Sequence, residues 1–355
     1  MSGLGELLFD RIRREGPLPV EEYMRLCLAH PEHGYYRSQT AIGAAGDFIT
    51  APEISQIFGE LVGLWAAALW TQMGRPSPLR LVELGPGRGT LMADALRAVA
   101  RVAGGFRAAL DLHLVEINPG LRQQQHAALA AAQPSWHDRL DTVPPGPLIV
   151  IANEFFDALP VRQIVRAGDG WHERVVACRD GRLAFAAGAS TASPDIAADA
   201  GAVLETSPAG EAWMQGIAAR IVAHGGGALV VDYGPAVRAP GDTLQAVRGH
   251  QPVSPLEEPG LCDLTAHVDF TGLAAAGRAA GAAAFGPIPQ SAFLRRLGIA
   301  ARAATLLQAA TPDQARVLEG SVRRLIEPAE MGTLFKALAV ASPDVGTPPG
   351  FDAQT

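Results

Sequence analysis

The stretch LRLVELGPGRGT (residues 79–90) joins an apolar run to a glycine-rich turn. The run predicts a buried strand, and TLMADALRAVARVA, which begins at the end of the turn, has apolar positions at helical spacing. Glycines let a backbone turn sharply and approach a ligand, while the N-terminus of the next helix offers free N–H groups. The order of strand, glycine turn and helix therefore predicts a ligand-binding loop, with an ordinary tight turn as the alternative.

Strands and helices alternate on both sides of this loop. Apolar runs at residues 110–117, 148–154, 228–234 and 331–341 predict further strands. Because strands that alternate with helices form parallel sheets, we predict an α/β, doubly wound, Rossmann-like domain over residues 79–355. Residues 1–78 read as a mostly helical N-terminal cover with a lid loop. Insertions are expected at about 162–210, where Gly-Asp-Gly and Asp-Gly turns separate β-prone segments, and at about 235–270.

The composition limits the class of protein. A net charge of −7 and a pI of about 5.7 disfavour general nucleic-acid binding. No apolar stretch reaches the length of a membrane span, and the N-terminus lacks the features of a signal peptide, so it is expected to form an amphipathic helix. The three cysteines are widely spaced. We therefore expect a cytoplasmic protein without disulfides or a structural metal.

The glycine loop is flanked by acids that select its ligand. Its spacing is G-x-G-x-G (Gly85, Gly87 and Gly89), which does not match the dinucleotide fingerprint G-x-G-x-x-G. Glu83, inside the strand end, suits the amino group of a methionine moiety, whereas it would repel a pyrophosphate. Glu116, at the end of the next strand, is placed to accept both hydroxyls of a ribose. These features favour S-adenosylmethionine (SAM), with Asp138 as a candidate for contacting adenine.

The segment NEFFDALP (residues 153–160) follows the apolar run at 148–152 and is expected at the carboxyl edge of the sheet. We expect Asn153 to hold the cofactor or a substrate amine, and Phe155 and Phe156 to wall the pocket. Glu154 and Asp157, three residues apart, would face the same side if the segment turned helically. Paired carboxylates suit a guanidinium, although capping of the following turn is an alternative for both.

A second polar segment, GDFITAPE (residues 46–53), precedes a predicted helix. Asp47 and Phe48 are candidates for a lid over the cofactor. Thr50 and Glu53 match the T-x-x-E capping box, so a purely structural role is an equal alternative for them. His30 and His33 lack further metal ligands nearby and are expected to be solvated loop residues.

The chain resembles the MidA family of class I SAM-dependent methyltransferases, bacterial relatives of mitochondrial complex I assembly factor 7. The specific segments are GDFITAPE and NEFFDALP, supported by ELGPGRGTLMADALR (83–97), HLVEINPGLR (113–122), VVDYG (230–234), DLTAHVDF (263–270), FLRRLGI (293–299) and MGTLFKAL (331–338). The resemblance implies a seven-strand, mostly parallel methyltransferase sheet with a helical N-terminal cover. It also implies arginine methylation, by the mitochondrial relatives, of a subunit of the respiratory NADH:ubiquinone oxidoreductase.

The leading hypothesis is a SAM-dependent protein arginine N-methyltransferase that assists respiratory complex I assembly. Glu154 and Asp157 are the predicted catalytic acids, and the expected partner is an arginine-bearing protein such as a complex I subunit. Three alternatives remain: a catalytically silent SAM-binding assembly chaperone, a small-molecule methyltransferase and, disfavoured by the glycine spacing, an NAD-dependent dehydrogenase. The sequence leaves open whether the chain forms a homodimer.

Overall fold

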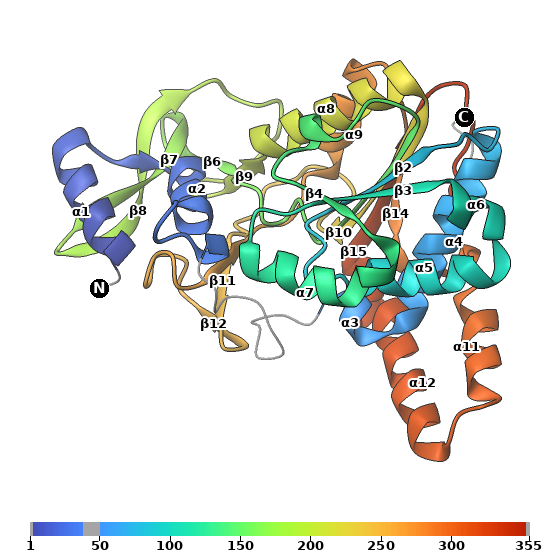
Figure 1. The fold of residues 1–355 in the computed structure, drawn as a ribbon. Helices are drawn as coiled ribbons and strands as arrows, with labels where there is room; N and C mark the ends of the chain where they lie inside the picture. Colours follow the sequence, from blue (N-terminus) through green and yellow to red (C-terminus); the bar gives the residue numbers. More distant parts are fainter. Residues whose placement is uncertain (1–2, 38–49, 353–355) are drawn as a thin grey trace. The chain divides into compact units, whose positions relative to one another are not determined.

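The structure of the chain is a computed structural model that describes residues 3–37 and 50–352 (Figure 1). The chain divides into two compact units. The β-rich unit comprises residues 1–48, 156–212 and 237–272, and the main-sheet unit comprises residues 49–155, 213–236 and 273–355. The predicted lid residues Asp47 and Phe48 lie outside the described residues.

The main-sheet unit contains a seven-stranded sheet with the order β14-β15-β10-β5-β2-β3-β4. The strands β4, β3, β2, β5 and β10 run parallel to one another, whereas β15 is antiparallel to both of its neighbours. The predicted α/β sheet, mostly parallel with seven strands, is therefore confirmed. The strands are β2 (Leu79–Leu84), β3 (Leu110–Val115), β4 (Ser135–His137), β5 (Leu148–Asn153), β10 (Gly226–Tyr233), β14 (Ala283–Pro289) and β15 (Phe335–Ala341).

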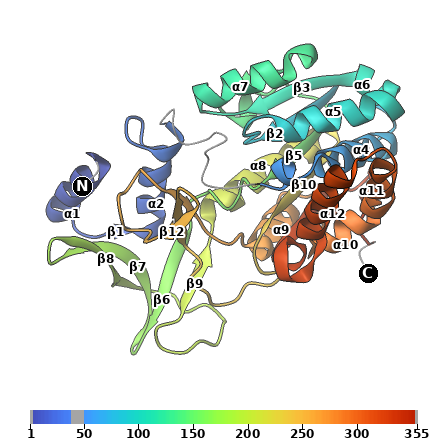
Figure 2. The same cartoon turned by 90° about the horizontal axis from the view of Figure 1, so that it is seen from below.

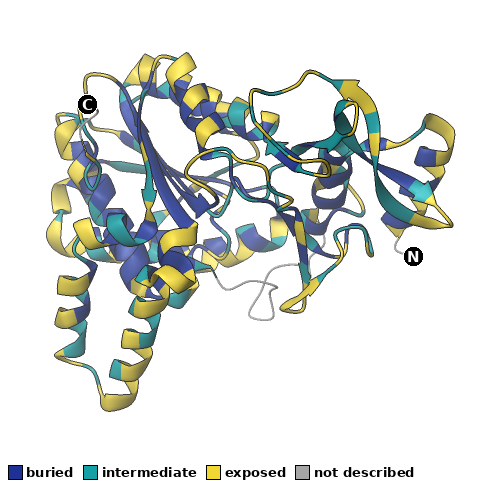
Figure 3. Cartoon of the chain, turned by 180° about the vertical axis from the view of Figure 1, so that it is seen from behind, coloured by how far each residue is buried: buried dark blue, intermediate teal, exposed yellow. Residues whose placement is uncertain are grey.

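The centre of this sheet is apolar on both faces, as the predicted strands require. Every residue of β10 and β15 is buried, and so are the first five residues of β5. Figure 3 shows this buried centre in dark blue between exposed helix faces. Parallel strands covered on both faces need such runs, because helices exclude water from each side.

Helices connect the strands and cover the sheet. On one face lie α4, α5 and α7, and on the other the C-terminal part of α8 and of α9 (Figure 2). Gly277 of α9 lies so close to Val340 of β15 that a Cβ atom would meet it at 3.0 Å. The helices are α3 (Ala51–Ile54), α4 (Gln56–Gln72), α5 (Thr90–Val102), α6 (Gly104–Ala109), α7 (Pro119–Leu129), α8 (Pro208–His224), α9 (Phe270–Ala279), α10 (Gln290–Arg296), α11 (Ile299–Leu307) and α12 (Pro312–Ile326).

The long helix α4 is held in the core of the main-sheet unit. Trp65 and Trp70 are buried there, and the indole N–H of Trp65 donates to the Pro349 carbonyl at 3.0 Å. The buried carboxylate of Glu60 accepts two hydrogen bonds from Arg302 of α11, at 2.6 and 3.0 Å. Because a buried carboxylate requires a charge partner, this pair fixes α11 against α4.

The β-rich unit has its own core. The predicted antiparallel insertion forms β6, β7, β8 and β9, and the short N-terminal strand β1 completes a five-stranded sheet. In this sheet β7 pairs with β1, β6 and β8, and β6 pairs with β9. The predicted amphipathic N-terminal helix is α1, which buries Leu4, Leu8 and Ile12. The unit consists of α1 (Gly3–Glu15), α2 (Val20–Ala29), β1 (Leu18–Pro19), β6 (Arg162–Ala167), β7 (Gly170–Arg179), β8 (Arg182–Thr191), β9 (Val203–Thr206) and a small sheet of β11 (Gln245–Arg248), β12 (Gln251–Val253) and β13 (Asp263–Thr265), with parts of α8 and α9.

Among the described residues, no helix combines the length and the apolar character needed to cross a membrane. The described cysteines Cys27, Cys178 and Cys262 are free thiols.

Candidate SAM site

The glycine loop follows β2 and leads directly into α5. Gly85, Gly87 and Gly89 all have positive φ, at 58°, 54° and 83°, a region that side chains with a Cβ atom rarely adopt. A Cβ atom on Gly85 would meet the ring of Phe155 at 3.0 Å, whereas one on Gly87 would meet no atom of the described residues within 4 Å. The loop therefore needs its glycines, and open space lies beside Gly87.

Glu83 provides a buried acceptor at the same sheet edge. Its side chain is only 3% exposed, and its Oε2 atom has no hydrogen-bond partner among the described residues. Burial raises the pKa of this carboxyl to about 8. The Oδ1 atom of Asn153, at the end of the neighbouring strand β5, likewise has no described partner. Because buried polar atoms without partners are costly, both atoms fit a ligand that brings N–H donors, such as the ammonium group of SAM.

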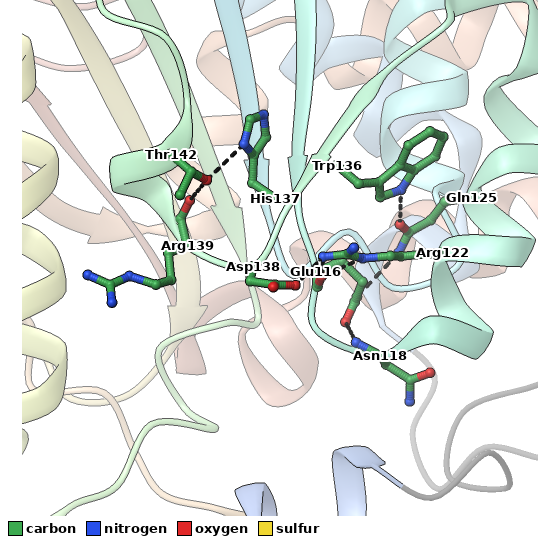
Figure 4. A network of polar contacts seen from close by, with 9 residues as sticks. All are labelled: Glu116, Asn118, Arg122, Gln125, Trp136, His137, Asp138, Arg139 and Thr142. Atoms are coloured by element: carbon green, nitrogen blue, oxygen red, sulfur yellow. Dashed lines mark hydrogen bonds and ion pairs between the residues drawn. The ribbon is translucent and has the colours of Figure 1, made fainter. Parts of the chain in front are cut away.

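Glu116, just after β3, presents a carboxylate that is held at both oxygens (Figure 4). Oε1 accepts a hydrogen bond from the Asn118 backbone N–H at 2.7 Å, and Oε2 accepts one from the Gln125 amide at 3.2 Å. Burial raises the pKa of Glu116, while these two hydrogen bonds and the Arg122 guanidinium act in the opposite direction. Each oxygen can accept a second hydrogen bond, so the group suits a ribose diol.

Asp138, one residue after β4, is linked to Glu116 through Arg122. The Arg122 guanidinium donates to the Glu116 main-chain carbonyl at 2.7 Å and forms an ion pair with Asp138 at 2.6 Å. The Asp138 side chain is 75% exposed. Asp138, which is predicted to contact adenine, therefore lies near Glu116, which is predicted to bind the ribose, as Figure 4 shows.

Gln125 belongs to the same network, although the sequence analysis did not select it. It is fully buried on α7, and its amide donates to the Gly87 carbonyl at 2.7 Å as well as to Glu116. One feature of the sequence marks the position: Gln125 lies four residues from Leu121 and from Leu129, both of which are buried.

Glu154 follows β5 and adopts a left-handed backbone conformation, with φ of 48°. Its Oε1 atom accepts hydrogen bonds from the Ala51 backbone N–H at 2.9 Å and from the Asn153 amide at 3.2 Å. A positive φ is rare for a residue with a long side chain and is characteristic of functional sites. The next residue, Phe155, donates its backbone N–H to Asp232 at 3.1 Å and packs edge-on against Trp213.

The segment after β5 does not make the helical turn that would have placed Glu154 and Asp157 on the same side. Residues 154–160 contain bends and a turn closed by the Leu159 N–H to Phe156 carbonyl hydrogen bond at 3.2 Å, but no helix. Asp157 is buried and belongs to the β-rich unit, whereas Glu154 belongs to the main-sheet unit. The left-handed conformation of Glu154 prevents a helix from starting there.

The capping box expected at Thr50 and Glu53 does not form. Thr50 precedes α3, but its side chain makes no capping hydrogen bond. The Glu53 carboxylate instead accepts a hydrogen bond from the Thr90 hydroxyl at 2.6 Å and pairs with Arg88 at 3.4 Å. Contacts with the glycine loop thus replace the local capping bond, and α3 is tied to the start of α5.

Other candidate polar groups have structural roles. The Nδ1 atom of His30 accepts hydrogen bonds from the backbone N–H groups of Glu32 and His33. Lys336, the only lysine of the sequence, is buried at the start of β15 and donates to the Thr333 and Leu334 carbonyls. Within the described ranges, no group of three or more His, Cys, Asp or Glu side chains is arranged to hold a metal ion.

Comparison with known proteins identifies the family. Residues 61–288 match a family model described as "Putative S-adenosyl-L-methionine-dependent methyltransferase". The chain belongs to this methyltransferase family. It is 38% identical to the protein named protein arginine methyltransferase NDUFAF7 homolog, mitochondrial, of Drosophila melanogaster, an alignment that covers 96% of this chain and 85% of that protein. It is 37% identical to the protein arginine methyltransferase NDUFAF7, mitochondrial, of Danio rerio, over 94% and 85% of the two chains.

A solved structure agrees with this assignment. A protein from Burkholderia thailandensis that is described as a "likely methyl transferase" and is bound to S-adenosyl-homocysteine superposes with a TM-score of 0.83 at 30% sequence identity. The match covers 98% of this chain and 93% of that one. The methyltransferase described here therefore has the class I fold and uses SAM, as predicted. SAM supplies the methyl group, and the residues described above fit its ammonium group and ribose.

Proposed function

We propose that this methyltransferase is a protein arginine N-methyltransferase. The proposal is supported by the names of its relatives, which match nearly the whole chain, and by the chemistry at the end of β5. The substrate is a protein that carries an arginine, and the family resemblance implies a subunit of the respiratory NADH:ubiquinone oxidoreductase. A cytoplasmic location stays a prediction from the sequence, whereas the names of the two relatives describe those proteins as mitochondrial.

Glu154 is the observation that carries the proposal. A carboxylate at the carboxyl end of a central parallel strand lies where the ligands of doubly wound sheets bind. Its backbone is left-handed, and its Oε1 atom is already oriented by the Ala51 N–H and the Asn153 amide. A fixed carboxylate can orient a guanidinium through paired hydrogen bonds and stabilise its positive charge during methyl transfer.

The other predicted residues have supporting roles in this proposal. Glu83 and Asn153 accept hydrogen bonds from the ammonium group of SAM, Glu116 accepts the ribose hydroxyls, and Asp138 contacts the adenine. Gly85, Gly87 and Gly89 let the backbone approach the cofactor, and Phe155 walls the site. The roles of Asp157 as a second acid and of Asp47 and Phe48 as a lid stay predictions from the sequence.

Mass spectrometry of cells that lack this protein provides the test. The proposal expects at least one methylated arginine to disappear from a partner protein, to return with the wild-type gene and to remain absent with Glu154→Gln. A complete arginine-methylation pattern in the deletion strain would refute the proposal. If the protein is a small-molecule methyltransferase, its deletion should leave the arginine-methylation pattern unchanged and alter the metabolites. If it is an assembly chaperone, Glu154→Gln should restore assembly of the partner complex as fully as the wild-type gene does.

A further inference from the structure

Gln125 connects two parts of the candidate SAM site that are distant in the sequence. One N–H₂ group donates both to the Gly87 carbonyl of the glycine loop, at 2.7 Å, and to the Glu116 carboxylate after β3, at 3.2 Å. Gly87 adjoins the open space of the loop, and Glu116 is the proposed ribose acceptor. A single buried amide thus fixes the separation between the loop and the acid.

Trp136 of β4 determines which way this amide points. Its indole N–H donates to the Gln125 Oε1 atom at 2.9 Å. If the amide were rotated by 180°, its N–H₂ group would face the indole N–H, and its oxygen would face the Gly87 carbonyl and the Glu116 carboxylate. All three hydrogen bonds would then be lost. Only one orientation satisfies the network, and Figure 4 shows the side chains in that arrangement.

We propose that Gln125, oriented by Trp136, is a positioning residue that holds the Glu116 carboxylate and the glycine loop in the geometry required for the ribose of SAM. This proposal rests on the role of Glu116 given under the proposed function. The carboxylate is held at one oxygen by the Asn118 N–H and at the other by Gln125. A group ordered before the ligand arrives loses less conformational freedom on binding, so affinity increases.

The main test replaces Gln125 by Met, which has a similar length and no hydrogen-bonding amide. The neighbouring Gln124 is exposed on the same helix, so Gln124→Met is the matched control. We expect Gln125→Met to weaken SAM binding by up to roughly tenfold in calorimetry, the cost of ordering one side chain on binding. The control should bind like the wild type. Equal affinities of the wild type and Gln125→Met would overturn the proposal.

A double-mutant cycle separates positioning from general packing. If Gln125 acts mainly through Glu116, Gln125→Met should weaken SAM binding by less than about threefold in a Glu116→Ala background. Binding of an S-adenosyl-homocysteine analogue with a 2′,3′-dideoxyribose should also be nearly insensitive to Gln125→Met. An equal loss for both ligands and in both backgrounds would show that the role is only structural.

The pH dependence gives an independent readout. The Gln125 amide opposes the rise in the pKa of Glu116 that burial causes, and Arg122 is the other charged group that acts on this carboxylate among the described residues. With Arg122 unchanged, Gln125→Met should raise the pKa of Glu116 further. When SAM affinity is measured against pH, the pH below which binding weakens should therefore be higher in Gln125→Met than in the wild type. The same pH in both proteins would contradict the proposal.

Trp136→Phe is the milder variant, because it keeps an aromatic ring at this position while it removes the N–H donor together with part of the indole ring system. It should weaken SAM binding by a smaller factor in the same direction, and unchanged binding would contradict the orienting role of Trp136. If Glu116→Ala binds SAM as the wild type does, the ribose assignment itself is wrong and Gln125 cannot act through it. If the wild type binds no SAM, the cofactor assignment fails instead.

Discussion

The Glu154 carboxylate accepts a hydrogen bond from the Ala51 backbone N–H at 2.9 Å, which ties the segment after β5 to the N-terminus of α3. Glu53 of α3 in turn contacts the glycine loop and the start of α5, since it pairs with Arg88 and accepts a hydrogen bond from Thr90. Two acids thus link three segments of the main-sheet unit. Substitutions of Glu154 must therefore distinguish its proposed contact with substrate from its contact with α3.

Glu154→Gln is the variant that makes this distinction. The glutamine oxygen can still accept the Ala51 N–H, so α3 stays in place, but the negative charge is lost. We expect SAM affinity within about twofold of the wild type, because the substitution does not change any residue that is proposed to contact SAM directly. Methylation of an arginine-bearing partner should fall by about 10²-fold or more, as measured with labelled SAM. The exposed Glu319→Gln is the control, and full activity of Glu154→Gln would remove Glu154 from catalysis.

Gly87→Val tests the glycine loop. Its φ of 54° disfavours any side chain, and the added atoms would occupy the open space in which the cofactor is expected. The variant should remain folded by circular dichroism and show no heat of SAM binding. Gly74→Val is the matched control, since Gly74 also has a positive φ, of 80°, and open surroundings. Binding that survives in Gly87→Val would exclude the loop from the site.

Glu116→Ala tests the ribose acceptor. The change removes charge-assisted hydrogen bonds worth about 1.5–3 kcal/mol, so the dissociation constant for SAM should rise roughly 10- to 100-fold. Glu116→Gln, which preserves the shape of the group, should lose less. A dissociation constant that does not change in either variant would leave Glu116 as a structural acid that only holds Asn118 and Gln125.

Glu83 should release a proton when SAM binds at pH 7. Its pKa is about 8 in the ligand-free protein, so most of the carboxyl is protonated at pH 7. The ammonium group of SAM favours the ionised form and lowers this pKa. Calorimetry in buffers with different ionisation enthalpies should therefore give different binding heats for the wild type and a constant heat for Glu83→Gln. Identical wild-type heats in all buffers would argue against a contact between Glu83 and the ammonium group.

The same carboxyl makes stability depend on pH. Since its pKa rises on folding from 4.5 to about 8, its contribution to stability is fully present below 4.5 and is lost as the pH rises through about 8. The melting temperature of the ligand-free wild type should fall over this window more than that of Glu83→Gln. If the melting temperatures of the two proteins change equally with pH over this window, Glu83 is not protonated in the folded state.

Much of the sheet could be predicted from the sequence, because its central strands are long apolar runs. The strand predicted at residues 79–84 matches β2, and that predicted at 148–154 exceeds β5 by one residue. Residues 290–326 were not predicted to contain helices, yet they form α10, α11 and α12. The sequence of α12 does carry helix signals, a capping box formed by Thr311 and Gln314 and an apolar stripe at Leu318, Val322, Leu325 and Ile326. The helix could therefore have been predicted from these signals but was overlooked.

The polar part of the site was harder to predict, because it depends on contacts between distant segments. Glu83 and Glu116 could be selected, since each ends a strand beside the glycine loop. The hydrogen bond of Glu53 could not be predicted, because its partner Thr90 lies 37 residues away in the sequence. The Thr90 hydroxyl binds the Glu53 carboxylate in place of the local capping contact. Gln125 was missed because a glutamine in a polar run usually faces water.

The position of β15 has a consequence for protein synthesis. It is the last described strand of the chain, yet it lies between β10 and β14 within the sheet. As the chain emerges from the ribosome, β10 keeps an unpaired apolar edge until α9, β14 and the helices α10 to α12 have been translated. Such edges promote association between nascent chains. A ribosome that stalls before Phe335 therefore yields a polypeptide that cannot close its sheet and depends on chaperones to remain monomeric.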